Sequence, residues 1–140
     1  MTRKYNVPSR RVEKEILFSL GTLAATSDEM PCLIAGTNLE ILSAHIVDTT
    51  GITANDTNYW TLAMKNKGAA GSGTDSICSV TTKTSVSGGT GDIAAFDAQS
   101  LGAITNGLLS KGSVASITAT KAASAPNTDN TLLVVRIREI

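Results

Sequence analysis

The segment Asn55-Asp-Thr-Asn-Tyr-Trp-Thr-Leu-Ala-Met-Lys-Asn-Lys-Gly-Ala-Ala-Gly-Ser-Gly-Thr74 reveals the fold class most clearly. Its large apolar residues Trp60, Leu62 and Met64 alternate with smaller or polar ones, which is the period of a β-strand with one buried face. Turn-forming residues precede this run, and a glycine-rich reversal over residues 67–73 follows it. We therefore expect a central strand of a β-sandwich, with the three large side chains in its core.

The rest of the chain shows similar short apolar runs separated by turns. Helix and strand patterns compete over residues 12–23, because residues 13–15 favour a helical turn, whereas Phe18 and Gly21 favour a strand. We prefer the strand. A turn is expected at residues 26–29, and residues 92–99 are the one candidate for a helical turn. The other expected strands cover residues 32–34, 39–47, 76–84, 101–105, 114–121 and 131–140.

These patterns predict an all-β chain, namely a single-domain antiparallel β-sandwich of the jelly-roll type with about eight strands and at most one short helix. A length of 140 residues fits one domain, and no internal repeat suggests a solenoid or a propeller. Within residues 92–99, Ile93 and Phe96 share a face, so Phe96 would close one end of the sandwich. The expected core residues are Phe18, Trp60, Leu62, Met64, Phe96, Ile117 and Val135.

The charges divide the chain into a basic extended N-terminal arm, residues 1–11, and a β-sandwich domain, residues 12–140. Residues 1–15 carry a net charge of +3 and the remaining 125 residues carry −3. Basic arms can bind nucleic acid, but this one has a single aromatic residue and no second basic patch supports it, so nucleic acid is an unlikely partner. A partly disordered terminus is the simplest interpretation. As a functional one we favour docking on an acidic protein surface, with Arg3, Lys4, Tyr5, Arg10 and Arg11 as candidate contacts.

The composition favours a protein that contacts neighbours. Hydrophobic residues make up 41% of the chain, and charged residues only 17%, against roughly 25% in typical soluble proteins. No run of about 18 apolar residues could span a membrane, so no membrane contact is expected. Residues 16–25 make a poor secretory signal, because two glutamates precede them and Ser19, Gly21 and Thr22 interrupt them. The chain is therefore expected to be made in the cytosol.

The sequence offers little for catalysis, and we predict that the protein is not an enzyme. His45 is the only histidine and lies within an expected strand, where packing is its commoner role. No serine stands in a G-x-S-x-G elbow, and the glycine run at residues 88–91 lacks the lysine of a phosphate-binding loop. No cofactor is expected.

Metal and disulfide sites are also weakly supported. Calcium needs about six oxygen ligands, and no short motif supplies them, so loop aspartates are better explained as turn residues and no metal site is predicted. Cys32 and Cys78 lie in apolar strand contexts, which favours buried free thiols; a disulfide would require their strands to be neighbours. The loop aspartates concerned are Asp48, Asp56, Asp75 and Asp92.

Residues 56–74 match the pattern D-T-N-x-[YFW]-T-L-x-[LV]-x-N-K-G-A-x-G-S-G-T in most positions. Ala95-Phe-Asp97, the turn Gly112-Ser-Val114 and the apolar final strand at residues 132–137 accompany it. With these features the chain resembles the capsid decoration, or cement, proteins of tailed bacteriophages, or a related small virion structural protein. The resemblance covers residues 16–140, and the basic arm lies outside it.

The resemblance implies a jelly-roll-like sandwich that binds the outer surface of an icosahedral head and clamps adjacent major capsid subunits. It also implies a location on the virion after synthesis in the bacterial host cytoplasm, and a homo-oligomer, dimer or trimer, is expected at symmetric lattice points. The alternative function is a carbohydrate- or receptor-binding jelly-roll module of a head or tail fibre, with Tyr59 or Trp60 as a stacking platform. In either case the expected neighbour contacts on the central strand are Tyr59, Thr61, Lys65 and Lys67.

Overall fold

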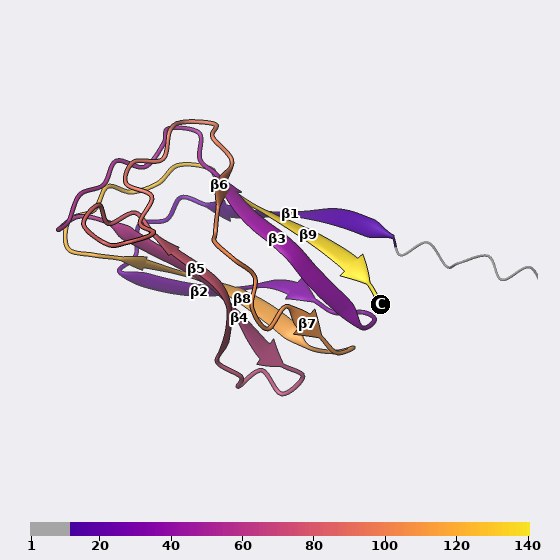
Figure 1. Cartoon of the computed structure of the whole chain (residues 1–140). Coiled ribbons are helices and arrows are strands. Elements are labelled where there is room, and N and C mark those ends of the chain that lie inside the picture. The colour runs from indigo at the N-terminus through magenta and orange to yellow at the C-terminus, as the bar shows by residue number, and fades with distance from the viewer. Residues whose placement is uncertain (1–11) are drawn as a thin grey trace, which may run out of the picture.

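The computed structural model describes residues 12–140, which form two antiparallel β-sheets stacked as a sandwich (Figure 1). The strands are β1 (Glu13–Gly21), β2 (Ser27–Ile34), β3 (Leu39–Val47), β4 (Trp60–Gly68), β5 (Asp75–Thr81), β6 (Gln99–Ser100), β7 (Leu108–Leu109), β8 (Val114–Lys121) and β9 (Thr131–Glu139). One sheet has the order β1-β9-β3-β6, with β7 also paired to β3, and the other has the order β2-β8-β4-β5.

The connectivity is that of a jelly roll. The first strand pairs with the last, β2 pairs with β8, and β3 and β4 then add to the other sides of β9 and β8. If β7 is taken as a short accessory strand beside β3, eight strands form two sheets of four. No helix occurs among residues 12–140. The predicted all-β sandwich is therefore confirmed, and no helix in this part of the chain is long and apolar enough to cross a membrane.

The core lies between the two sheets and takes alternate residues from each long strand. In β4, an interior strand as expected, the buried positions alternate with half-buried ones along Trp60 to Met64. Phe18 is only half-buried and packs against the margin of the core, because β1 lies at the edge of its sheet. The other expected core residues that the structure buries are Trp60, Leu62, Met64, Ile117 and Val135.

The expectation for Phe96 is wrong. Its side chain is 73% exposed, and its backbone has a φ of 60° instead of a helical value. Residues 92–99 form no helical turn, because Ile93 exchanges both backbone hydrogen bonds with Ile52 and so holds this part of the loop extended. The next bond, from the Phe96 N–H to the Asp48 carbonyl, turns the chain so that Phe96 faces outward.

Two other local predictions are also wrong. Residues 26–29 are not a turn, since β2 begins at Ser27 and pairs with Thr120 of β8. Residues 101–105 are not a strand, and only Gln99 and Ser100 just before them pair with β3. The strand over residues 12–23 is correct, because β1 pairs with β9 along most of its length.

Candidate interaction surfaces

The four expected neighbour-contact residues all lie at β4, on the side that faces away from the core. Thr61 and Lys65 alternate with the buried residues of β4, and Lys67 continues the same face. Tyr59 precedes the strand. Each of the four side chains is half-buried, so neighbouring residues cover part of each one. Tyr59 and Thr61 line one hollow on this outer face and Lys67 lines another, whereas Lys65 lines neither.

The first hollow surrounds Tyr59 and Thr61. It is open, has a volume of about 430 Å³, and its floor and rim come from β4, β5 and the loop after β5. The Lys83 ammonium lies 5.4 Å from the centroid of the Tyr59 ring, which is a cation–π distance. The hollow therefore combines one aromatic ring and one cation with several hydroxyl groups, from Thr61, Ser79, Thr81 and Ser87.

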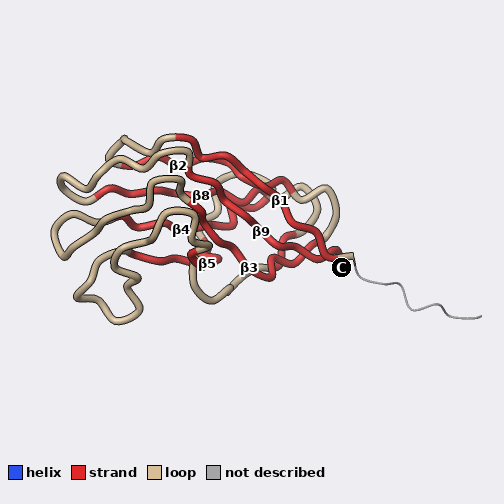
Figure 2. Tube along the Cα trace, turned by 90° about the horizontal axis from the view of Figure 1, so that it is seen from above, coloured by secondary structure: helices blue, strands red, loops and turns tan. Residues whose placement is uncertain are grey.

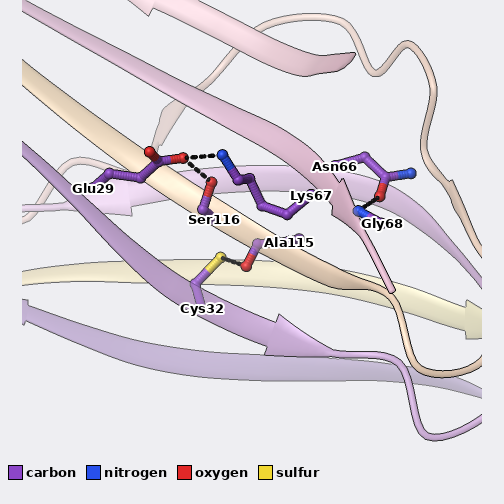
Figure 3. Close-up of polar contacts among 7 residues, drawn as sticks. All are labelled: Glu29, Cys32, Asn66, Lys67, Gly68, Ala115 and Ser116. Atoms are coloured by element: carbon purple, nitrogen blue, oxygen red, sulfur yellow. Dashed lines mark hydrogen bonds and ion pairs between the residues drawn. The ribbon is translucent and has the colours of Figure 1, made fainter. Parts of the chain in front are cut away.

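The second hollow, of about 340 Å³, contains an ion pair that sequence reasoning missed. Figure 3 shows Glu29 of β2 reaching both Ser116 of β8 and Lys67 of β4. The Ser116 hydroxyl donates to Glu29 Oε1 at 2.7 Å, and Lys67 Nζ lies 3.2 Å from the same oxygen. These contacts, the serine bond first, lower the pKa of Glu29. Lys67 is thus engaged within the chain, and only 20% of its side chain is exposed.

The turn after β4 is held by its own polar side chain. The Asn66 side-chain oxygen accepts a hydrogen bond of 2.9 Å from the Gly68 N–H, and Figure 3 shows this bond beside the ion pair. The Gly73 N–H then donates to the Lys67 carbonyl at 2.8 Å and closes the reversal. The glycine-rich segment is therefore an ordered turn that positions Lys67 next to Glu29.

Three of the four expected loop aspartates act in loop architecture, whereas Asp75 is not a turn residue, because it begins β5 and pairs with Asn66. The carboxylate of Asp48 is fully buried and accepts hydrogen bonds from Thr50, Asp129 and Thr131. Asp56 accepts bonds from the Thr84 hydroxyl and the Ser85 N–H, which lower its pKa, and Asp92 accepts one from Ala54. Within residues 12–140, no group of three or more His, Cys, Asp or Glu side chains is arranged to hold a metal ion.

The histidine and the thiols do not form a joint site. His45 is half-buried on β3, next to Val134 of β9 and Ser100 of β6. Cys32 and Cys78 are buried free thiols in the other sheet, and Cys32 contacts the Ala115 carbonyl (Figure 3). They stand on β2 and β5, at opposite edges of that sheet, so they are not neighbours. Burial raises the pKa of Cys32 to about 12 and that of Cys78 to about 11.

Exposed apolar side chains collect at one end of the sandwich, here called the C-terminal end. It contains Val12, the turns at residues 35–38, 69–74 and 110–113, and Ile140. Backbone hydrogen bonds join the turn at 35–38 to two other segments, from Ala35 to Ser113, from Gly112 to Ala35 and from Ile140 to Asn38. Figure 2 shows that the long loops gather at the opposite end. The exposed apolar residues of the C-terminal end are Val12, Ile34, Leu108 and Ile140.

The arm residues expected to contact a capsid, Arg3, Lys4, Tyr5, Arg10 and Arg11, lie outside the described residues. The first described residue, Val12, is at the C-terminal end, where its carbonyl accepts a hydrogen bond from the Glu139 N–H. The arm is thus joined to the domain at the end that carries the apolar side chains. Sequence reasoning missed Ile34 and Leu108, because period-2 alternation does not reveal which strand ends stay uncovered.

Comparisons with known proteins give little further information. No protein-family model matches the chain, and no curated protein matches it. Among solved structures, the match "Structure of infectious bursal disease virus Gx strain" has a TM-score of 0.38 and 11% sequence identity. That match covers 91% of this chain and 32% of the other, so this chain spans about a third of its length. A TM-score this low assigns neither a shared fold nor a shared function.

Proposed function

We propose that the protein is a virion structural protein of a tailed bacteriophage that decorates and stabilises the capsid by binding the outer surface of major capsid subunits. The observation that carries the proposal is the C-terminal end, where four exposed apolar side chains lie at the same end of the sandwich as the point at which residue 12 enters the domain. Fully burying a side chain such as Ile34 or Leu108 contributes about 1.5–3 kcal/mol. A few such contacts per copy suffice when many copies bind one lattice.

The distribution of charge supports attachment through this end. Four ion pairs occur within residues 12–140, and they engage four of the eight Lys and Arg residues of the domain. The basic residues 1–11 then supply cations for an acidic partner surface next to the apolar contacts. The carboxylates of Asp48, Asp56 and Asp92 accept hydrogen bonds that hold loops together. This structural role supports a binding function and not a catalytic one.

The test is sedimentation of the purified protein with capsids that lack it. The wild-type chain is expected to co-sediment saturably. The double variant Ile34→Thr/Leu108→Gln removes apolar surface at the C-terminal end and should weaken binding at least about tenfold. Val86→Thr is the matched control, because Val86 is an exposed apolar residue in the loop after β5 and not at this end. Wild-type protein that stays in the supernatant would refute the proposal.

A carbohydrate-binding module is the second candidate function, and the hollow around Tyr59 is the observation that favours it. Aromatic rings flanked by hydroxyl groups suit sugar rings, which present apolar faces and polar edges. Trp60 is not available as a platform, because it is 1% exposed and its Nε1 donates to the Pro126 carbonyl. Binding to a glycan array that Tyr59→Ala abolishes, while Ile34→Thr, a change at an exposed apolar residue outside the hollow, retains it, would establish this function instead.

A further inference from the structure

A sheet edge offers unpaired backbone groups to other chains, and natural β-proteins usually block their edges. Three of the four edges formed by residues 12–140 are blocked. The β3 edge carries β6 and β7. Along β5, Thr105 donates from its N–H to the Ile77 carbonyl at 2.7 Å. The β2 edge contains Pro31, which has no N–H, and a bulge directly after it.

The fourth edge, β1, has a bulge only at its end, between Ser19 and Gly21, and within residues 12–140 no further strand pairs with its side away from β9. β1 is nine residues long and pairs with β9 in regular register from Glu13 to Ser19. Figure 1 shows β1 beside β9. The Glu139 N–H bonds to the Val12 carbonyl, so by the alternation of an antiparallel ladder the N–H and C=O groups of Glu13, Glu15, Leu17 and Ser19 point away from β9. The centre of this free edge carries Leu17, whose side chain is 64% exposed.

We propose that β1 pairs antiparallel with β1 of a second copy of this chain, about a two-fold axis at Leu17. In this register Leu17 faces Leu17 of the second copy on the outer face of the sheet. On the inner face, Ile16 faces Phe18 of the second copy. Both of these side chains are partly buried at the margin of the core, so pairing would extend each core into the next. The result is one continuous sheet across an isologous dimer.

The residues of β1 favour a second copy over an unrelated strand because they complement themselves. In an antiparallel ladder, two residues that face each other either both direct their N–H and C=O groups toward the partner strand or both direct them away from it. The two-fold axis must therefore pass through one residue position and not between two neighbouring positions. An axis at Glu15 would place two glutamates opposite each other, which is unfavourable. The axis at Leu17 places Glu15 opposite Ser19 and Lys14 opposite Leu20, so no like charges meet. The inference goes beyond the proposed function and does not depend on it.

Position-specific crosslinking tests the register. Directly opposite residues of this type have Cα atoms about 5.5 Å apart, which suits a disulfide. Leu17→Cys is therefore expected to form a disulfide-linked dimer under mild oxidation. Ser19→Cys is the matched control on the same edge, because two copies of residue 19 would lie about 14 Å apart at a rise of about 3.4 Å per residue. Equal crosslinking of both variants would overturn the register. The natural cysteines are buried and should not interfere.

Sedimentation equilibrium of the full chain tests the dimer itself. The wild type is expected to dimerise, and Leu17→Lys should weaken the dimer at least about tenfold, because it removes an apolar contact and opposes two cations on the axis. Ile34→Lys changes an equally exposed residue at the end of β2 and should leave the dimer intact. A wild type that is monomeric at all concentrations would overturn the proposal. A monomer that dimerises only when residues 2–11 are deleted would show that these residues occupy the edge, and would overturn it too.

Discussion

Asp48 illustrates how a single polar residue can belong to the core of this fold. Its carboxylate is fully buried, and its two oxygens accept hydrogen bonds from the turn at Thr50 and from the start of β9 at Thr131. Its carbonyl oxygen also accepts the Phe96 N–H. A buried carboxylate is tolerated when its lone pairs are satisfied in this way. One residue, through its side chain and its backbone carbonyl, thereby joins three loops at the end of the sandwich opposite the C-terminal end.

Phe96 is a site of local backbone strain. A φ of 60° is costly for most residues, at roughly 1–2 kcal/mol, whereas Asn adopts this region readily. The exposed ring contributes little packing, so Phe96→Asn should raise the free energy of unfolding by about 1 kcal/mol. Chemical denaturation measures the change. Leu108→Asn is the control, since Leu108 is similarly exposed but has no positive φ, and it should give no gain. A less stable Phe96→Asn variant would contradict the prediction.

The two thiols predict a pH dependence of stability. Burial raises their pKa values from 9.0 to about 12 for Cys32 and about 11 for Cys78, so the folded chain favours the neutral thiols. Their contribution is fully present below pH 9.0 and is lost as the pH rises through the folded-state values. Urea titrations should show a steeper alkaline loss of stability for the wild type than for Cys32→Ala/Cys78→Ala.

Thiol reactivity checks the burial of both cysteines directly. At neutral pH, a thiol reagent should react with them only after unfolding. Rapid reaction of the folded chain would show that the thiols are not buried.

At the scale of the elements, β3 shows where simple alternation fails. Its buried residues are Leu39 and Ile41, then Ala44 and Ile46, so the inward face changes by one position within the strand. The cause is a bulge between Ile41 and Ser43 in the pairing with β9. Strict period-2 alternation would place Ile41 and His45 on one face. The bulge instead turns Ile41 inward and leaves His45 half-buried on the outer face.

The turn after β4 gives a prediction at this scale. A Cβ atom on Gly73 would lie 2.6 Å from the Asn66 carbonyl oxygen and 2.9 Å from the Lys67 carbonyl carbon, both backbone atoms. Gly73→Ala should therefore force the turn open and lower the free energy of unfolding by about 2 kcal/mol. It should also separate Lys67 from Glu29. Gly36→Ala is the matched control in another turn, because no atom lies within 4 Å of its Cβ position. Equal stability of the two variants in thermal denaturation would disprove the clash.

At the scale of the whole molecule, the two ends of the sandwich differ in character. The long loops at one end are tied together through Asp48, Thr128 and the Trp60–Pro126 hydrogen bond. The C-terminal end has tight turns and exposes Ile34 and Leu108. A rigid sandwich with one apolar end suits attachment to a large surface, since little of the domain has to become ordered on binding.

Deletion of residues 2–11 tests the contribution of the basic arm. The fold of residues 12–140 should persist, with unchanged circular dichroism and melting temperature, because the sheets and the core are built from the retained residues. Capsid occupancy should fall, and the remaining binding should depend less on salt, because the deleted cations interact with the partner electrostatically. Replacement of the four arm cations by Gln is the matched control for charge. Unchanged occupancy of the deletion variant on capsids would contradict the role of the arm.

The sequence by itself determined the fold class and most of the strands. In β4, β8 and β9 the side-chain alternation is local information, so Trp60, Ile117 and Val135 could be predicted as core residues. The tertiary structure alone decided where β2 begins, which way Phe96 faces and that Lys67 pairs with Glu29. It also decided that, among residues 12–140, no strand pairs with the outer edge of β1. The physical reason is that each of these features depends on a hydrogen-bond partner, or on its absence, far away along the chain, and no short window of sequence contains that information.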